Sequence, residues 1–153
     1  MDGRIIIRNA SLDDFQAIQL LFRKMFDIFY EDQDVEYPYK ESGKRYLIER
    51  IEHGIVIVAM IDNRIIGFLT GSIEKSLDFK TYEEYGFIHN MFILEEYRSI
   101  GIGKSLVGTF IDRCKEQGIS YIHTDSDANQ MLINFYTGIG FKINGVNYKM
   151  KLT

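Results

Sequence analysis

The chain has 153 residues, of which 46% are hydrophobic and 26% charged, the balance of one globular domain spanning residues 1–153. The formal net charge of −4 and the lack of any apolar run near the roughly 20 residues of a membrane span argue against nucleic-acid and membrane partners. One cysteine excludes an internal disulfide, and the N-terminus lacks the pattern of a signal peptide, so we expect a cytoplasmic protein.

The first half of the chain is expected to form three strands and two helices. Strands are predicted over residues 4–8, 55–61 and 65–73, and helices from Ser11 onward and over residues 42–53. Ser11 is expected to cap the first helix. Asp14 stands at the third helical position, so the pair forms a capping box in which Asp replaces the longer Glu. The pair Asp62-Asn63 lies between two β-branched runs, which predicts a hairpin with a tight turn.

The second half is expected to alternate strands and helices. Strands are predicted over residues 85–94 and 119–124, helices over 103–117 and 129–138, and a final strand pair over 141–152 around Asn144-Gly145. This order favours an α+β fold. We expect a mostly antiparallel, twisted sheet of about six to seven strands, about four helices, and one strand–helix–strand crossover.

A glycine-bearing turn, residues 98–103, joins a predicted strand to a predicted helix. Its two glycines let the backbone approach a ligand, and the N–H groups and dipole of the first helical turn attract an anion such as pyrophosphate. Arg98 and Lys104 would add positive charge. The spacing lacks the Gly-x-x-x-x-Gly-Lys pattern of P-loop enzymes and the third glycine of the dinucleotide fingerprint. Alone, the turn also fits an ordinary strand–helix connection.

Two motifs around this turn carry a family resemblance. Residues 88–103 read Ile-His-Asn-Met-Phe-Ile-Leu-Glu-Glu-Tyr-Arg-Ser-Ile-Gly-Ile-Gly, and residues 129–136, Asn-Gln-Met-Leu-Ile-Asn-Phe-Tyr, lead to Gly140-Phe141. Together they resemble the GNAT superfamily of N-acyltransferases. Leu132 replaces that family's usual Ala, Glu95 replaces a frequent Pro, and Ser99-Ile100 replaces a more basic pair. The resemblance is specific over residues 85–142 and architectural over residues 1–84.

The resemblance implies a CoA site. No metal is expected, because no His, Cys and Asp residues have the spacing of metal ligands. The fourth and fifth strands would splay apart, and the pantetheine arm of acetyl-CoA would bond the backbone between them, near Met91. Cofactor binding is thereby expected at Met91, Phe92, Ile93, Arg98, Ser99, Ile100, Gly101, Ile102, Gly103, Lys104, Ser105, Asn129, Asn134 and Tyr136. Asn129 would also cap its helix.

Tyr136 is the expected general acid, because a Tyr pKa of about 10 is close to that of the leaving thiol. Phe135, its neighbour, is expected in the core. His89 is the expected base, with Glu84 or a water chain as alternatives. Strict alternation would place His89 on one face of its strand with Met91, and Asn90 on the other. Cys114 lies on an apolar helix face and is expected to be buried and unreactive.

These residues lead us to expect an N-acetyltransferase that moves an acetyl group from acetyl-CoA directly to a primary amine. A non-catalytic CoA-binding module of the same fold is the alternative. The acceptor would be cationic if the acidic stretch over residues 31–36 lines its groove, although a solvated loop also explains that stretch. The resemblance also makes a homodimer an expectation, formed through residues 141–152 or an edge strand.

Overall fold

A five-stranded sheet forms the centre of the computed structural model, which describes residues 3–29, 41–127 and 129–152. Its strands are β1 (Ile6–Asn9), β2 (Ile55–Ile61), β3 (Arg64–Lys75), β4 (Glu84–Ile93) and β5 (Ile122–Thr124), which lie in this order across the sheet. All neighbours are antiparallel except β4 and β5, which are parallel. The acidic stretch over residues 31–36 lies outside the described residues.

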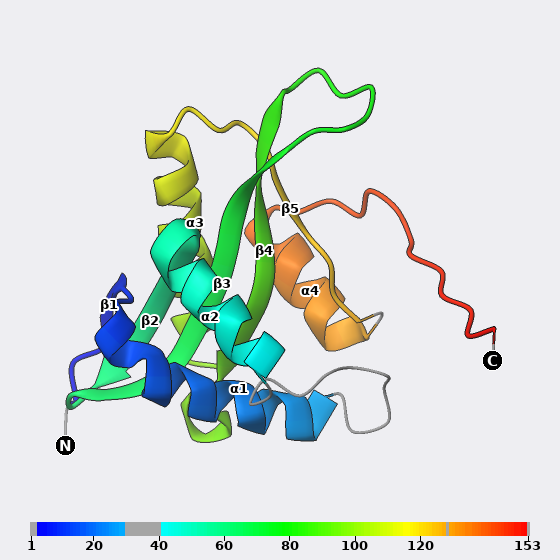
Figure 1. Cartoon of the computed structure of the whole chain (residues 1–153). Coiled ribbons are helices and arrows are strands. Elements are labelled where there is room, and N and C mark those ends of the chain that lie inside the picture. The colour runs from blue at the N-terminus through cyan, green and yellow to red at the C-terminus, as the bar shows by residue number, and fades with distance from the viewer. Residues whose placement is uncertain (1–2, 30–40, 128, 153) are drawn as a thin grey trace.

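Helices cover both faces of this sheet (Figure 1). They are α1 (Phe15–Phe29), α2 (Glu41–His53), α3 (Ile102–Glu116) and α4 (Gln130–Ile139), with short 3-10 turns at Leu12–Asp14 and Glu95–Tyr97. On one face, the ring of Phe22 in α1 stacks on Phe68 of β3, with 4.6 Å between centroids. On the other face, Phe110 and Cys114 of α3 pack against backbone that carries no side chain, at Gly71 and Gly86. No helix among the described residues is long and apolar enough to cross a membrane.

Local hydrogen bonds place the 3-10 turn that leads into α1 and the β2–β3 turn where the sequence predicts a helix start and a hairpin. The Ser11 N–H donates to the Asp14 carboxylate over 2.8 Å, and Arg8 donates to both oxygens of that carboxylate over 2.8 and 2.9 Å. These donors, Arg8 first, lower the pKa of Asp14. Asp62 and Asn63 have φ values of 48° and 62°, the left-handed pair of a tight hairpin turn.

The prediction of a final strand pair over residues 141–152 is wrong. No strand forms in this segment, so the sheet has five strands instead of six or seven. A strand is held by hydrogen bonds to a neighbouring strand, and this segment has no such neighbour in the described structure. Two strands start later than predicted: β1 begins at Ile6, where its pairing with Met60 begins, and β5 begins at Ile122, where it first pairs with β4.

The close approach of α3 to the sheet predicts a large cost for a side chain at Gly71. A Cβ there would run into the Phe110 ring and lie 2.8 Å from the carbonyl oxygen of Phe87. Gly71→Ala should therefore lower the free energy of unfolding by about 1–3 kcal/mol or more. Gly108→Ala is the control, because a Cβ at that helical position meets nothing within 4 Å. It should raise stability by about 0.5–1 kcal/mol, and urea unfolding of both variants checks the pair.

Candidate active site

The sheet opens between β4 and β5. The two strands pair over only three positions, the last joining Ile88 to Thr124. There the Thr124 hydroxyl donates to the Ile88 carbonyl over 3.2 Å. Beyond Ile88, β4 continues along β3 as far as Ile93, whereas β5 ends at Thr124. In the described structure, residues 89–93 therefore have no strand on their β5 side, which confirms the expected splay.

A bulge at the opening turns two consecutive side chains to the same face. Thr70 of β3 pairs with Asn90, but the next residue, Gly71, pairs with Ile88, so His89 is the extra residue of β4. The His89 ring contacts Ser72, and Asn90 accepts a hydrogen bond from Thr70, two residues before Ser72 on the same strand. The prediction that strict alternation separates His89 from Asn90 is therefore wrong. Both side chains lie on the face that α1 and α2 cover.

The glycine loop ends in an open helix N-terminus. Ser99 and Gly101 have φ values of 64° and 90°, and the Gly101 carbonyl accepts the first helical hydrogen bond of α3, from Ser105, over 3.1 Å. No side chain of the described residues caps this end. The N–H groups of the first turn, from Ile102 on, have no acceptor within the helix, and a Cβ at Gly101 would point into open space. The arrangement fits an anion such as pyrophosphate.

Arg98 has a different environment from the one expected. Its Nε donates to the Ile93 carbonyl over 2.7 Å, and its guanidinium lies 5.3 Å from the centre of the Phe92 ring. The side chain therefore ties the loop back to the end of β4. Phe92 itself is buried and could offer a ligand only its backbone. Among the other predicted loop residues, Ile102 and Gly103 are buried, while Ser99, Ile100, Lys104 and Ser105 are exposed.

The helix α4 places Tyr136 beside the opening. Gly103 allows the helix to pack closely, since a Cβ there would lie 3.2 Å from the Phe135 ring, and Phe135 packs against the core as predicted. Tyr136 is half-buried. Burial raises its pKa, and a hydrogen bond with the Thr124 side chain offsets this in part. The phenol therefore keeps its proton at neutral pH and can donate it.

The two asparagines of α4 differ in their contacts. The Asn129 side chain accepts a hydrogen bond from the Leu132 N–H over 2.9 Å, which confirms its prediction as the helix cap. Asn134 is exposed, and its side-chain oxygen accepts from the Gln130 amide over 2.7 Å.

His89 is part of a polar cluster with Ser72 and Glu74, two residues that the sequence did not single out. The Ser72 hydroxyl lies 2.6 Å from Glu74 Oε1 and 2.7 Å from His89 Nε2. A carboxylate can only accept, so Ser72 donates its one proton to Glu74 and accepts from His89 Nε2–H. The neutral ring then carries its lone pair on Nδ1. Its side chain is 21% exposed, so a substrate can reach it.

The charge state of His89 suits a base. Burial is the main cause that lowers its pKa from the ordinary 6.5, and the positive charge of Arg50 lowers it further. Glu74, 3.6 Å from Nε2, acts in the opposite direction. The imidazole is therefore neutral at pH 7. Glu84, the alternative base, is exposed at the start of β4, opposite Lys75.

Polar and aromatic side chains surround His89 on this face of the sheet. Asn90 accepts hydrogen bonds from Tyr46 of α2, over 2.9 Å, and from Thr70, over 3.0 Å, so its carbonyl oxygen is occupied. The ring of Phe87 lies 4.8 Å from that of His89. Further along, the Tyr82 hydroxyl lies 2.7 Å from Nε2 of His123.

Cys114 is buried, and burial raises its thiol pKa to about 11. The thiolate is the reactive form, so a thiol reagent at pH 8 should leave the folded protein nearly unlabelled and should react fully in urea. An absorbance assay with a chromogenic disulfide measures both rates. Rapid labelling of the folded protein would contradict the burial of Cys114 and would reopen a covalent acyl-cysteine.

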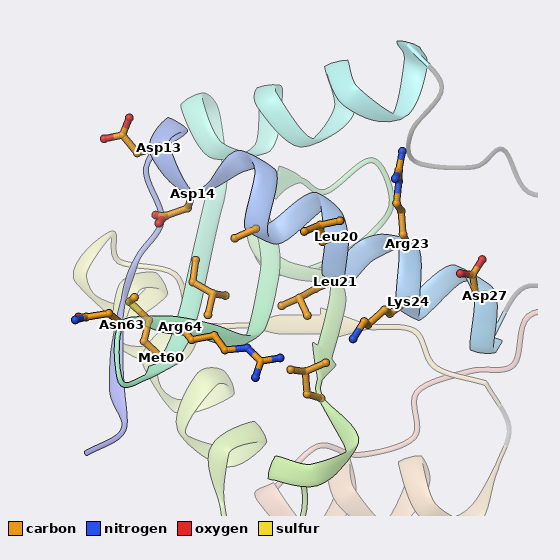
Figure 2. A pocket seen from close by; sticks show the side chains of 13 residues that line it. Asp13, Asp14, Leu20, Leu21, Arg23, Lys24, Asp27, Met60, Asn63 and Arg64 are labelled. Carbon is orange, nitrogen blue, oxygen red and sulfur yellow. The ribbon is translucent and has the colours of Figure 1, made fainter. Parts of the chain in front are cut away.

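A further groove lies elsewhere, between α1 and the β2–β3 turn (Figure 2). Its volume is about 590 Å³ and its rim carries both signs of charge, including Asp13, Lys24 and Arg64. None of the residues that line it is a predicted site residue. The described residues also contain no cluster of three His, Cys, Asp or Glu side chains that could hold a metal ion.

The chain matches the acetyltransferase (GNAT) family over residues 16–141. It is 28% identical over 149 residues to an uncharacterized N-acetyltransferase of Methanocaldococcus jannaschii, covering 89% of this chain and 60% of that relative. The chain thus spans about three-fifths of that relative's length.

Solved structures share the fold. An aminoglycoside N-acetyltransferase in complex with CoA has a TM-score of 0.79 at 18% identity, over 100% of this chain and 98% of that one. A predicted acetyltransferase of Clostridium acetobutylicum with acetyl-CoA has a TM-score of 0.82 at 16% identity, over 97% of each chain. With the family match, the chain belongs to the acetyltransferase (GNAT) family.

Proposed function

We propose that this protein transfers an acetyl group from acetyl-CoA directly to a primary amine. One observation carries the proposal: the open N-terminus of α3 and the half-buried phenol of Tyr136 flank the point where β4 and β5 part. An anion site, an unpaired strand edge and a proton donor are what a CoA thioester requires.

The donor would be held mainly by backbone. The first-turn N–H groups of α3 would bind the pyrophosphate, with Lys104 and Ser105 exposed beside them. The unpaired edge of β4 around Met91 would bond the pantetheine amides, and a backbone N–H there would stabilise the oxyanion. The Ile93 carbonyl already accepts from Arg98, so Arg98 is a positioning residue for the loop in this proposal.

Two side chains would move the protons. Nδ1 of neutral His89 takes a proton from the ammonium group of the acceptor, directly or through a water, and the free amine attacks the thioester carbonyl. The new C–N bond forms as the C–S bond breaks, and the nitrogen releases its second proton to water as the neutral amide forms. Tyr136 donates its proton to the departing thiolate and is reprotonated from solvent, and His89 returns its proton to solvent, so the products are an acetylated amine and the CoA thiol. The inert Cys114 favours this direct route over an acyl-enzyme.

We propose further that the acceptor is cationic and enters from the face of α1 and α2. His89 opens to that face, and the Glu74 carboxylate, 40% exposed, lies 3.6 Å from its ring. The rings of Phe87 and Tyr85 lie on the same strand face, where aromatic surfaces attract ammonium groups. The structural neighbour that is an aminoglycoside N-acetyltransferase also takes an amine acceptor, as its name states.

A panel of primary amines tests this function. Purified full chain is incubated with acetyl-CoA and, separately, a polyamine, an aminoglycoside, an amino acid and a peptide with a free N-terminus, while release of the CoA thiol is followed. We expect release above the amine-free rate with at least one amine, fastest with polycations and slowed by salt. Binding of acetyl-CoA without release for any amine would replace this proposal with the non-catalytic CoA-binding module.

The pH profile tests the role of His89. We expect kcat/KM to rise through a midpoint below 6.5, because protonated His89 cannot accept a proton, and then to level off. Glu74→Gln removes the charge that raises this pKa, so the midpoint should move lower. Arg50→Gln removes a charge that lowers it, so the midpoint should move higher. Initial rates are measured with an amine that titrates well above this range. A midpoint unmoved in both variants would exclude His89 as the base.

A further inference from the structure

The groove between α1 and the β2–β3 turn is separate from the candidate active site. None of the residues that line it belongs to the opening between β4 and β5 or to the glycine loop. Its volume of about 590 Å³ lies within the range of roughly 300–1,000 Å³ that is typical of small-molecule sites. The fold therefore builds a second site of ligand size, which the proposed acetyl transfer does not use.

The floor of the groove is apolar. Its apolar lining residues are Ala17, Leu20, Leu21, Met60, Ile65 and Leu94. Leu21 and Leu94 are buried in the core, so they fix the floor, whereas Leu20 is 58% exposed beside it. A large apolar side chain that is open to water gains free energy when an apolar ligand covers it. An aliphatic chain lying along the groove would provide that cover.

Two cationic side chains point into the groove from opposite walls. Figure 2 shows Arg64, at the start of β3, and Lys24, on α1, directed toward each other across the groove. In the described structure neither forms an ion pair with an acidic side chain. Two cations that face each other repel, and an anion between them would remove this repulsion and be attracted by both charges. The polar end of a ligand in the groove would therefore be anionic.

The acidic side chains of the groove limit how much negative charge it accepts. Asp14 is already paired with Arg8 over 2.8 Å, and Figure 2 shows Asp13 and Asp27 directed away from the space between the two cations. The carboxylates of Asp13 and Asp27 still lie at the rim, where they would repel a polyanion. A ligand with one negative charge and an apolar body complements this arrangement best.

We infer that this groove binds a small amphiphilic carboxylate, an aliphatic chain over the apolar floor with its carboxylate between Arg64 and Lys24. The planar guanidinium of an arginine can donate two hydrogen bonds to one carboxylate, and the lysine adds a compact positive charge. The chain would cover Leu20 and lie over Leu94. Since the groove shares no residue with the opening between β4 and β5, this inference does not depend on the proposed acetyl transfer.

Matched probes test the class of ligand. Octanoate is titrated into the purified full chain and compared with octanol, which keeps the chain without the charge, and with acetate, which keeps the charge without the chain. Calorimetry should give octanoate a Kd at least about 10-fold lower than either. In NMR spectra of isotope-labelled protein, octanoate should shift the amide signals of Leu20, Ile65 and Leu94. Undetectable binding of octanoate, equal binding of octanol, or shifts confined to residues outside the groove would overturn the inference.

Variants that remove one charge locate the carboxylate. Arg64→Gln and Lys24→Gln each remove one of the facing cations, and Arg45→Gln removes the same charge from an exposed position of α2 outside the groove. The first two should each raise the Kd of octanoate at least about 3-fold, and Arg45→Gln should leave it unchanged. All three side chains are exposed, so thermal unfolding should show the variants folded. An unchanged Kd in Arg64→Gln or Lys24→Gln, or an equal rise in Arg45→Gln, would contradict the assigned site.

Discussion

Tyr136→Phe should lower kcat for acetyl transfer by about 10²- to 10⁴-fold, the usual contribution of a positioned general acid. The variant loses one hydroxyl and keeps the ring that packs against Phe135 and Phe141. Burial holds the Tyr136 pKa above its ordinary value, so the wild-type phenol is protonated across the working range and its loss removes a proton source. Steady-state rates of CoA release with the best amine of the panel measure the effect.

The controls separate chemistry from binding. Acetyl-CoA affinity by calorimetry should stay nearly unchanged in Tyr136→Phe, because the hydroxyl is assigned to the leaving group. Tyr148→Phe removes the same group from a ring that is 91% exposed and should keep full activity. If Tyr136→Phe turns over at the wild-type rate, another group protonates the thiolate. If its affinity falls as far as its rate, Tyr136 is a binding residue.

The second large effect is expected at the glycine loop. Gly101→Glu should weaken acetyl-CoA binding by about 5- to 1,000-fold, since a carboxylate about 4 Å from a phosphate costs roughly 1–4 kcal/mol at a protein surface. Part of the loss should return at high salt, because salt screens the repulsion. Calorimetric titration at two salt concentrations measures both effects.

Gly118→Glu is the matched control for that variant. Gly101 and Gly118 have φ values of 90° and 75°, and a Cβ at either meets nothing within 4 Å. Both substitutions therefore add the same charge and a similar backbone strain of about 1–2 kcal/mol, at opposite ends of α3. Only Gly101→Glu should weaken acetyl-CoA binding. Equal losses in both variants would mean that strain, and not the loop, controls binding.

Features set by local chemistry were predictable from the sequence. The bond of Ser11 to Asp14, the left-handed turn at Asp62 and the Asn129 cap each join residues at most three positions apart. Each therefore forms from the short stretch of sequence that contains it. The same holds for the glycine-bearing turn between β4 and α3, which the sequence placed between a strand and a helix.

The faces of β4 were not predictable in this way. The bulge at His89 depends on how β4 registers against β3, a pairing between residues about twenty positions apart. The partnership of His89 with Ser72 and Glu74 depends on the same register. The alternation of Ser72 and Glu74 along β3 was the available signal, because it places both side chains on one face.

The predicted strand pair after α4 was wrong for a further reason. Alternation over residues 142–152 reports a preference for a strand, but a strand also needs a partner edge, which sequence pattern does not supply.

We propose that this chain moves an acetyl group from acetyl-CoA to an amine at the opening between β4 and β5. The most direct test supplies the purified full chain with acetyl-CoA whose acetyl group is isotopically labelled, together with the amine panel, and follows the label by mass spectrometry. The label should appear on an amine, at a rate reduced by Tyr136→Phe, and none should accumulate on the protein. Label that stays in bound acetyl-CoA with every amine, or that collects on Cys114, would contradict the claim.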